Sequence, residues 1–536
     1  MKSLLKPTMY ALFVVCLVST FTCAIAQQVN NQSALTPVTT TGSTKKPEES
    51  NVNERLQKLE KLIESQQQEI KELRALVGRL PAEDKNAGQV TTPETSVPPT
   101  APVNAVGSTS TSSSEKKTEV SPYWFDRLKV SGDFRFRLET FRNQGFDSPL
   151  EVPSRNRLRV RARLELKTDN CKDVGGPCFD FGLRLATGNF TDNISTNQTL
   201  TDFYERKPFT LERAFVRFNW KFDGPWKLEL TAGKFEPTFR RAQMVWDDDV
   251  NVEGISEALS FSSGQKLYGV KLVAFQLPFN EAPAGKDGML YGGQLQTDWK
   301  FGENSKADLN AGYYSWNHAD LVLSGLGAAT TQVNGGISNS AAVTGGQNGD
   351  LGTTNRIIRD PITGQIKLDA TGKPIGFVAN FNLFDVLGNY VWRVSPETPV
   401  RFTFDYVRNL SRRIDNENNG YWASIEVHRT KCQWNKGRWA KQNDDNCDEL
   451  SKRGDLLLGY TFTRIQQDAV LVPFNFSDIL ASNSRVHIPT IAYVPHENVV
   501  LQWTGLFSQR ANKIFPLSPV NRWLNRMQFD VIYKFK

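Results

Sequence analysis

Polar and apolar residues alternate along most of the chain, from residue 128 to its end. The clearest stretch is RNRLRVRARLELK at 155–167, where leucine, valine and alanine share one face and charged residues the other. Because successive side chains of a β-strand point to opposite faces, the pattern predicts strands with one apolar and one charged side. A water-soluble β-sandwich would have to repeat this charged face over more than 400 residues without helices to cover its sheets. A transmembrane barrel, with lipid outside and water inside, imposes the pattern on every strand.

About sixteen alternating segments can be counted, with boundaries uncertain by a few residues. They are centred near residues 134, 161, 183, 215, 231, 259, 272, 295, 311, 388, 404, 425, 459, 489, 503 and 530. Connections after even-numbered segments are mostly short, whereas odd-numbered segments precede the long ones, near 189–208, 237–254, 318–376 and 467–483. Short periplasmic turns and longer outer loops are typical of outer-membrane barrels. The expected fold is therefore all-β, a transmembrane antiparallel barrel of about 16 strands over 122–536, with both ends in the periplasm.

The N-terminus has the pattern of a secretory signal peptide over residues 1–26. Lys2 and Lys6 precede an apolar run at 9–18, and the small-residue site Ala24-Ile25-Ala26 follows it. A lipid anchor at Cys23 is the alternative. No later stretch approaches the roughly 20 consecutive apolar residues that a membrane helix needs.

Residues 52–80 carry apolar side chains at the alternating three- and four-residue spacing of a coiled coil. Isoleucine and valine at a with leucine at d favour two strands, whereas Leu62 and Leu76 at g widen the apolar seam toward three. A single amphipathic helix is the alternative. Pro81 ends the segment, and residues 81–121 are rich in threonine, serine and proline, which predicts a disordered linker.

Charge and cysteine content narrow the chemistry. The formal net charge is +7, and removing the signal peptide takes away two lysines and no acids, leaving +5, too small an excess to predict nucleic-acid binding. The four cysteines beyond the signal peptide form two close pairs, Cys171 with Cys178 and Cys432 with Cys447. In an exported chain this spacing predicts two local disulfides. A metal site is the alternative, although neither pair has CxxC spacing and the four histidines are scattered.

No nucleophile elbow, phosphate-binding loop or HExxH motif is present, so we expect no enzymatic activity and no cofactor. The stretch 247–253 places acidic and amide side chains at alternate positions, a spacing compatible with calcium. However, Val252 stands where a calcium loop of the EF type needs glycine, so we expect no resident metal.

Several motifs, in order, resemble those of the putative porins of Gram-negative outer membranes: GDFRFR, RNRLRVRARLEL, STNQTLTDF, ERAFVRF, AGKFEPTF and VWDDDVNVEG. The similarity covers most of residues 125–536. It implies a pore for small hydrophilic solutes and, by analogy with general porins, a homotrimer embedded in outer-membrane lipid. The C-terminus departs from many such barrels, because Lys536 follows the aromatic Phe535.

In general porins the third outer loop folds inward and forms the constriction, and by our count this loop is 236–254. Its acidic residues are the expected constriction groups: Asp247, Asp248, Asp249 and Glu253. Arginines on the inner faces of the first, second and fourth strands are the expected pore-lining groups: Arg135, Arg137, Arg157, Arg159, Arg161, Arg163, Arg213 and Arg217. Opposed acids and bases would create a transverse field with at most a mild anion preference. Alternatively, the arginines are solvated lumen charges braced by nearby carboxylates.

A second function is compatible with the sequence. The coiled coil and linker could tether the outer membrane to the cell wall, with the pore secondary.

Overall fold

The computed structural model describes residues 127–535 with several gaps. The intervals left out are 144–153, 172–173, 175, 190–193, 201–202, 263–266, 282–284, 326–329, 334–335, 340–354, 364, 371–373, 396, 431–449, 473, 480–481 and 513–521. The expected signal peptide, coiled coil and linker lie outside the described residues, as does the pair Cys432 and Cys447. Their disulfide stays a prediction, whereas the disulfide between Cys171 and Cys178 is confirmed.

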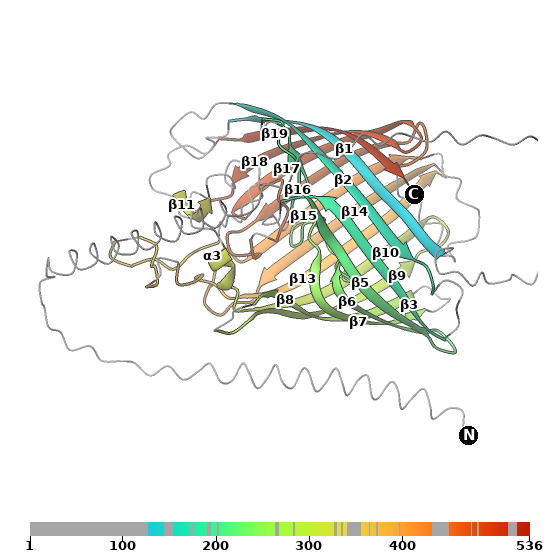
Figure 1. Ribbon diagram of the computed structural model, residues 1–536, viewed down its shortest axis with the longest axis horizontal. Coiled ribbons are helices and arrows are strands. Elements are labelled where there is room, and N and C mark those ends of the chain that lie inside the picture. The colour runs from blue at the N-terminus through green and yellow to red at the C-terminus, as the bar shows by residue number, and fades with distance from the viewer. Residues whose placement is uncertain are drawn as a thin grey trace, which may run out of the picture. The chain divides into compact units, whose positions relative to one another are not determined.

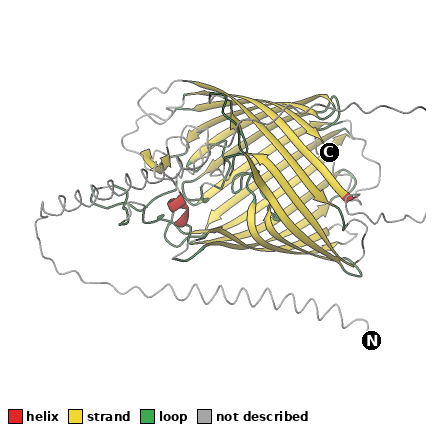
Figure 2. Cartoon of the chain, viewed as in Figure 1, coloured by secondary structure: helices red, strands yellow, loops and turns green. Residues whose placement is uncertain are grey.

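Sixteen long strands form one antiparallel barrel (Figures 1 and 2). They are β1 (Leu128–Arg142), β2 (Arg155–Thr168), β3 (Gly176–Thr187), β5 (Phe209–Lys221), β6 (Trp226–Phe235), β7 (Val252–Ser262), β8 (Leu267–Asn280), β9 (Gly288–Lys300), β10 (Ser305–Asn317), β13 (Phe381–Ser395), β14 (Thr398–Asn409), β15 (Asn419–Arg429), β16 (Leu456–Ile465), β17 (Ser484–His496), β18 (Val499–Arg510) and β19 (Leu524–Phe535). Each of the sixteen expected segment centres falls inside one of these strands, so the predicted strand number is confirmed.

The remaining elements are short. The two-residue strand β4 (Gln198–Thr199) pairs with β2, and β11 (Thr330–Val333) with β12 (Gly336–Asn339) forms a separate hairpin. The helix α3 (Leu321–Gly325) lies in the long connection after β10. Within the described part of the chain, no helix is long and apolar enough to cross a membrane.

The barrel closes because the first strand pairs with the last. β1 hydrogen-bonds to β2 on one side and to β19 on the other, with Phe136 opposite Val160 and Val531. Each of the sixteen barrel strands therefore has two neighbours, and the described part of the barrel has no unpaired edge strand. Long connections gather at one end, where α3 and β11 lie in Figure 1, and short turns such as 222–225 and 301–304 at the other.

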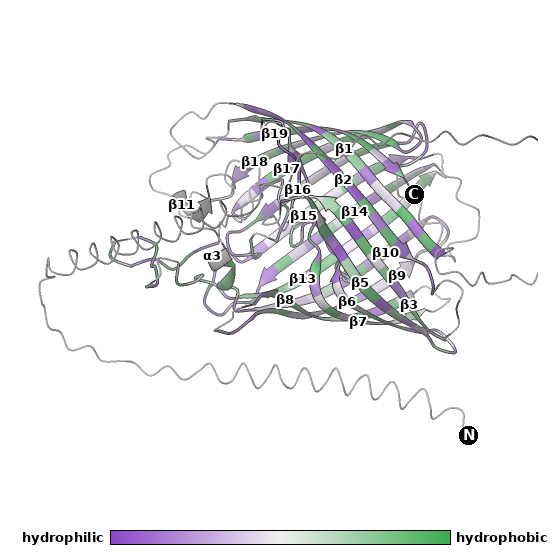
Figure 3. Cartoon of the chain, viewed as in Figure 1, coloured by the Kyte–Doolittle hydropathy of each residue, from purple (hydrophilic) through white to green (hydrophobic). Residues whose placement is uncertain are grey.

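Hydrophilic and hydrophobic residues alternate along the barrel strands (Figure 3), and the exposed, outward set is apolar. Large side chains such as Phe134, Phe181, Leu272 and Phe404 are exposed by about half on this face. In water such a continuous apolar surface would be unfavourable by about 25 cal/mol per Å². A hydrocarbon environment removes this penalty, as expected for a membrane barrel.

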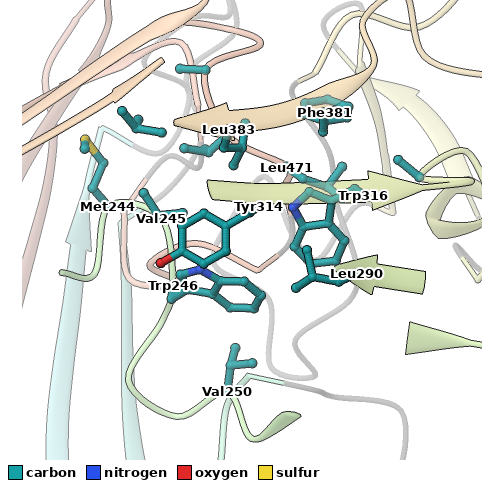
Figure 4. Packing of buried hydrophobic residues seen from close by; sticks show 14 of the residues in the cluster. Met244, Val245, Trp246, Val250, Leu290, Tyr314, Trp316, Phe381, Leu383 and Leu471 are labelled. Atoms are coloured by element: carbon teal, nitrogen blue, oxygen red, sulfur yellow. The ribbon is translucent and has the colours of Figure 1, made fainter. Parts of the chain in front are cut away.

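The inner face is not polar all round, which differs from the sequence expectation. Inward side chains of β8, β10 and β13, among them Phe275, Tyr314, Trp316 and Leu383, are fully or almost fully buried. Figure 4 shows Tyr314 and Trp316 packed against Trp246, a residue of the β6–β7 connection. These inward positions are apolar because they contact folded loops instead of water.

Candidate pore constriction

The barrel encloses a cavity of about 3630 Å³. It extends from the short turns, where Phe222 and Pro225 line it, to the acidic residues 247–249. A barrel of this strand number is wide enough to leave space for water, unlike one of eight strands. The expected site residues that line the cavity are Arg135, Arg137, Arg161, Arg163, Arg213, Arg217, Asp247, Asp248 and Asp249.

Seven inward arginines of three adjacent strands form what we call the arginine wall. Its members come from β1, β2 and β19: Arg135, Arg137, Arg157, Arg159, Arg161, Arg163 and Arg526. Strand alternation puts them all on the inner face. The register then places like charges side by side, with Arg135 opposite Arg161 and Arg137 opposite Arg159. Such rows are destabilising unless carboxylates lie between them.

Three inward carboxylates neutralise much of the wall. Asp133 accepts hydrogen bonds from Arg161 at 2.8 Å and from Arg163 at 2.5 Å. Glu139, which is fully buried, accepts from Arg157 and, at 2.6 Å, from Arg526. Asp530 accepts from Arg137 at 2.7 Å. Because these groups are largely removed from water, each depends on its partner, and the wall is a fixed surface and not a set of mobile charges.

The β6–β7 connection, residues 236–251, folds into the barrel. Phe239, Met244 and Trp246 are buried, and Phe239 packs against Tyr314 with ring centroids 5.3 Å apart. Trp246 stacks on Trp316 at 5.4 Å. Burial of three large side chains fixes the loop on the apolar side of the lumen. Of its acidic residues, Asp249 faces the arginine wall.

A second loop, which the sequence analysis did not assign to the constriction, lies beside the first. It is the β16–β17 connection, residues 466–483, and Phe474 stacks on Trp316 at 4.7 Å. The backbone N–H of Ser477 donates to Asp247 Oδ2 at 2.7 Å, and that of Asp247 donates to the Phe474 carbonyl at 2.9 Å. The two loops therefore form one unit.

This second loop contributes Asp478, which contacts two members of the arginine wall. Its carboxylate lies 3.2 Å from Arg137 and 2.6 Å from Arg526. The sequence pattern did not lead us to expect Asp478, Arg526 or Asp530 among the residues of the constriction. Alternation in residues 524–535 puts Arg526 and Asp530 on one face, so counting inward charges on the last strand could have found them. No sequence pattern marks Asp478, because its position depends on how the loop packs.

The pKa values of the three acids of the inward loop are shifted in different directions. Burial raises the pKa of Asp247 well above its usual range, and the neighbouring charge of Asp249 adds to this. Burial also raises the pKa of Asp248, although Arg241 and a hydrogen bond from Gln243 act in the opposite direction. For Asp249, burial alone would raise the pKa, but Arg161, Arg163 and Arg135 outweigh it, and the net pKa is lowered.

Asp249 is therefore the acid that keeps its negative charge at the arginine wall. Its Oδ1 lies 3.4 Å from Arg163 Nη1 and 3.7 Å from Arg161 Nη1. This contact joins the inward loop to the arginine wall.

Four of the expected residues differ from the others in position. Arg157 and Arg159 belong to the wall but lie buried behind the cavity surface. Arg213 contacts Asn251 and Glu236, and Arg217 contacts Thr231, so both brace the β5–β7 side of the lumen.

The prediction for Glu253 is wrong. The strand β7 begins at Val252, so Glu253 lies within the strand on the same face as the outward Ile255. It pairs with Lys234 at 2.6 Å on the outside of the barrel. Because successive side chains of a strand point to opposite faces, Glu253 faces outward although the residues next to it in the chain face the lumen.

The calcium alternative is also not supported by the geometry of 247–253. Asp247 accepts hydrogen bonds from the backbone N–H groups of Asp249 and Ser477, and Asn251 Oδ1 accepts a hydrogen bond from the Arg213 side chain. Asp249 faces arginines. The described residues contain no group of three or more histidine, cysteine, aspartate or glutamate side chains that could hold a metal ion.

Comparison with known proteins identifies the family. A family model described as "Putative porin" matches residues 146–502. No curated protein sequence matches the chain.

Solved structures with a similar fold include three porins. Pseudomonas putida OprB at high pH has a TM-score of 0.43 and 11% identity, covering 77% of this chain and 95% of its own. Salmonella typhi OmpF in complex with daunomycin has a TM-score of 0.41 and 8% identity, covering 76% of this chain and 97% of its own. A triple mutant of the Rhodopseudomonas blastica porin has a TM-score of 0.35 and 10% identity, covering 76% of this chain and 100% of its own.

Proposed function

The chain belongs to the Putative porin family, and from this premise we propose that it is a passive outer-membrane channel for small hydrophilic solutes and ions, with at most a mild anion preference. The observation that carries the proposal is a cavity of about 3630 Å³ that is lined by arginines of the arginine wall and by the acids of the inward loops. Charges fixed on opposite sides of a narrow passage orient dipolar solutes and set ion preference.

Counting the fixed charges supports a mild anion preference. Seven arginines form the wall, and the carboxylates in contact with them are five: Asp133, Glu139, Asp249, Asp478 and Asp530. Seven minus five leaves an excess of two positive charges. Such an excess raises the local anion concentration, and salt screens the effect, with a Debye length of about 10 Å at 0.1 M.

The reversal potential across a planar bilayer under a salt gradient tests this proposal. Replacing Arg159 and Arg161 with alanine should shift it toward cation selectivity, and replacing Asp248 and Asp249 with asparagine should shift it the other way. The shifts should be largest in dilute salt, because screening weakens them. If the purified protein conducts no ions, the channel function is wrong; if it conducts and neither pair changes the potential, these residues do not border the passage.

We extend the proposal to a homotrimer whose contact face includes the outer side of β7 and β8. Glu257 lies there between Ile255 and Leu259, level with Leu230 and Ala274, and Gln276 donates to it at 3.4 Å. Its second carboxylate oxygen is buried without a hydrogen-bond partner in the described chain. A charged group in the lipid-facing belt is unfavourable, so contact with a second copy would stabilise it. A monomeric mass in mild detergent would contradict the trimer.

The proposed orientation places the N-terminal segment in the periplasm. An even number of strands puts both barrel ends on the same side, the side of the short turns. Protease added to intact cells should then leave residues 27–121 uncut; cleavage there would reverse the orientation.

A further inference from the structure

Two members of the arginine wall lack the neutralisation that the others have. Arg135 forms no ion pair with any described residue, and it is about 9% exposed. The nearest carboxylate to Arg159 is Glu139, with 3.9 Å between Arg159 Nη1 and Glu139 Oε2. Glu139 is already shared by Arg157 and Arg526. The positive excess of the wall is therefore concentrated at Arg135 and Arg159.

Both arginines converge on the same segment of the β3–β5 connection. Arg135 Nη2 donates to the side-chain oxygen of Asn197 at 2.5 Å, and Arg159 Nη2 donates to the Asn197 carbonyl at 3.0 Å. Arg159 also contacts Ser195 Oγ at 3.2 Å. Thr199 lies directly opposite Arg159 in the β2–β4 pairing, on the same face. The guanidinium groups of Arg135 and Arg159 thus gather around Asn197, and the hydroxyl of Thr199 lies on the same face as Arg159.

Several donors of this cluster are buried and have no hydrogen-bond partner among the residues that the structure describes. They are Arg135 Nε, Arg159 Nε and Thr199 Oγ1. Buried polar groups in folded proteins are nearly always hydrogen-bonded, so unpaired donors at two neighbouring cations indicate a missing acceptor. The acceptor that suits them is an anion with several oxygens, because a guanidinium offers paired N–H groups to phosphate or carboxylate.

We propose that Arg135, Arg159 and Thr199 form a binding site for a small oxyanion carried by the permeating solute, either inorganic phosphate or a carboxylate group. Arg135 and Asn197 line the cavity, so the site opens to the passage. The inference rests on the proposed channel function and deepens it, because it names the class of solute. Asn197 positions both arginines by accepting one hydrogen bond from each.

Inhibition of chloride current by inorganic phosphate tests this site. With the full-length channel in a planar bilayer, added phosphate should reduce the chloride current and the reduction should saturate. Replacing Arg135 or Arg159 with glutamine should raise the half-blocking concentration at least tenfold. The matched control is Lys167→Gln, which removes the same charge from the inner face of β2 at the short-turn end of the cavity and should keep the half-blocking concentration within twofold.

Thr199→Val keeps every charge and covers the case in which an arginine variant fails to fold. It should raise the half-blocking concentration several-fold. Repeating the titration with acetate separates the two sources of oxyanion: a lower half-blocking concentration for phosphate assigns a phosphate site, and the reverse assigns a carboxylate site. Block that does not saturate, or that Lys167→Gln weakens as much as Arg135→Gln, overturns the inference while leaving the channel function intact. Absence of any current would refute the channel function itself.

Discussion

The two sides of the lumen are built from the same alternating strands but hold the inward loops in different ways. On β19, β1 and β2 the inward side chains are charged, and Asp249 and Asp478 join them to the loops through ion pairs. On β8, β10 and β13 the inward side chains are apolar, and the loops pack on them through Trp246 and Phe474. We call this second side the apolar wall.

The difference shows that an inward position need not face water. Apolar packing excludes water and holds the loops against one side of the lumen, whereas the cavity borders Arg135, Arg137, Arg161 and Arg163 of the arginine wall. The ion pairs then set how closely the loops approach that wall. Stability of the constriction should depend mainly on the apolar wall, and ion preference mainly on the arginine wall.

The largest effect should come from Trp246→Ala. Removing this buried ring leaves a void beside Tyr314 and Trp316 and should lower the free energy of unfolding by about 3–5 kcal/mol. Because the same ring holds the inward loop, single-channel conductance should also rise. Thermal unfolding in detergent and bilayer recording measure the two effects. The control Trp392→Ala removes an outward-facing ring and should leave conductance unchanged; equal conductance changes would refute the anchoring role.

The second-largest effect should come from Glu139→Gln. This variant leaves the buried Arg157 and Arg526 without their carboxylate, so the free energy of unfolding should fall by about 3 kcal/mol. Denaturant titration of the refolded barrel measures it. Glu253→Gln is the matched control on the outer face, where loss of the exposed pair with Lys234 should change stability by less than about 1 kcal/mol. A small loss for Glu139→Gln would mean that the wall is solvated.

Asp478→Asn should leave the fold intact and move the reversal potential toward anion selectivity. The variant removes one of the five carboxylates that offset the arginine wall and releases Arg137 and Arg526 from one contact. The shift should decline with added salt. An unchanged reversal potential would show that Asp478 does not border the passage.

The smallest effect concerns pH. Because burial raises the pKa of Asp248, its carboxylate should take up a proton at a higher pH than a free aspartate, whose pKa is about 3.9. As the pH falls through the raised pKa, one negative charge disappears and anion preference should increase slightly. Asp249, whose pKa is lowered, should stay ionised over the same range. Asp248→Asn should weaken the pH dependence of the reversal potential, whereas an unchanged pH dependence would assign it to another group such as Asp247, whose pKa burial also raises.

Strand alternation was sufficient to predict the barrel, its sixteen strands and the inward direction of the arginines. It failed at Glu253, where the boundary between loop and strand was misplaced by a few residues and the side chain changed face. It could not distinguish Arg163, which borders the cavity, from Arg159, which lies behind it. It also could not find Asp478 or the stacking of Trp246 on Trp316, because contacts between residues far apart in the chain determine both.

The most direct test of the central claim, that solutes pass along the arginine wall, is the accessibility of a cysteine placed on each wall. In single-channel recordings, a charged thiol reagent should change the current of the Arg163→Cys channel, because residue 163 borders the cavity. The same reagent should leave the Leu383→Cys channel unchanged, because residue 383 lies beneath the packed loops. Reaction at residue 383 without reaction at residue 163 would contradict the account.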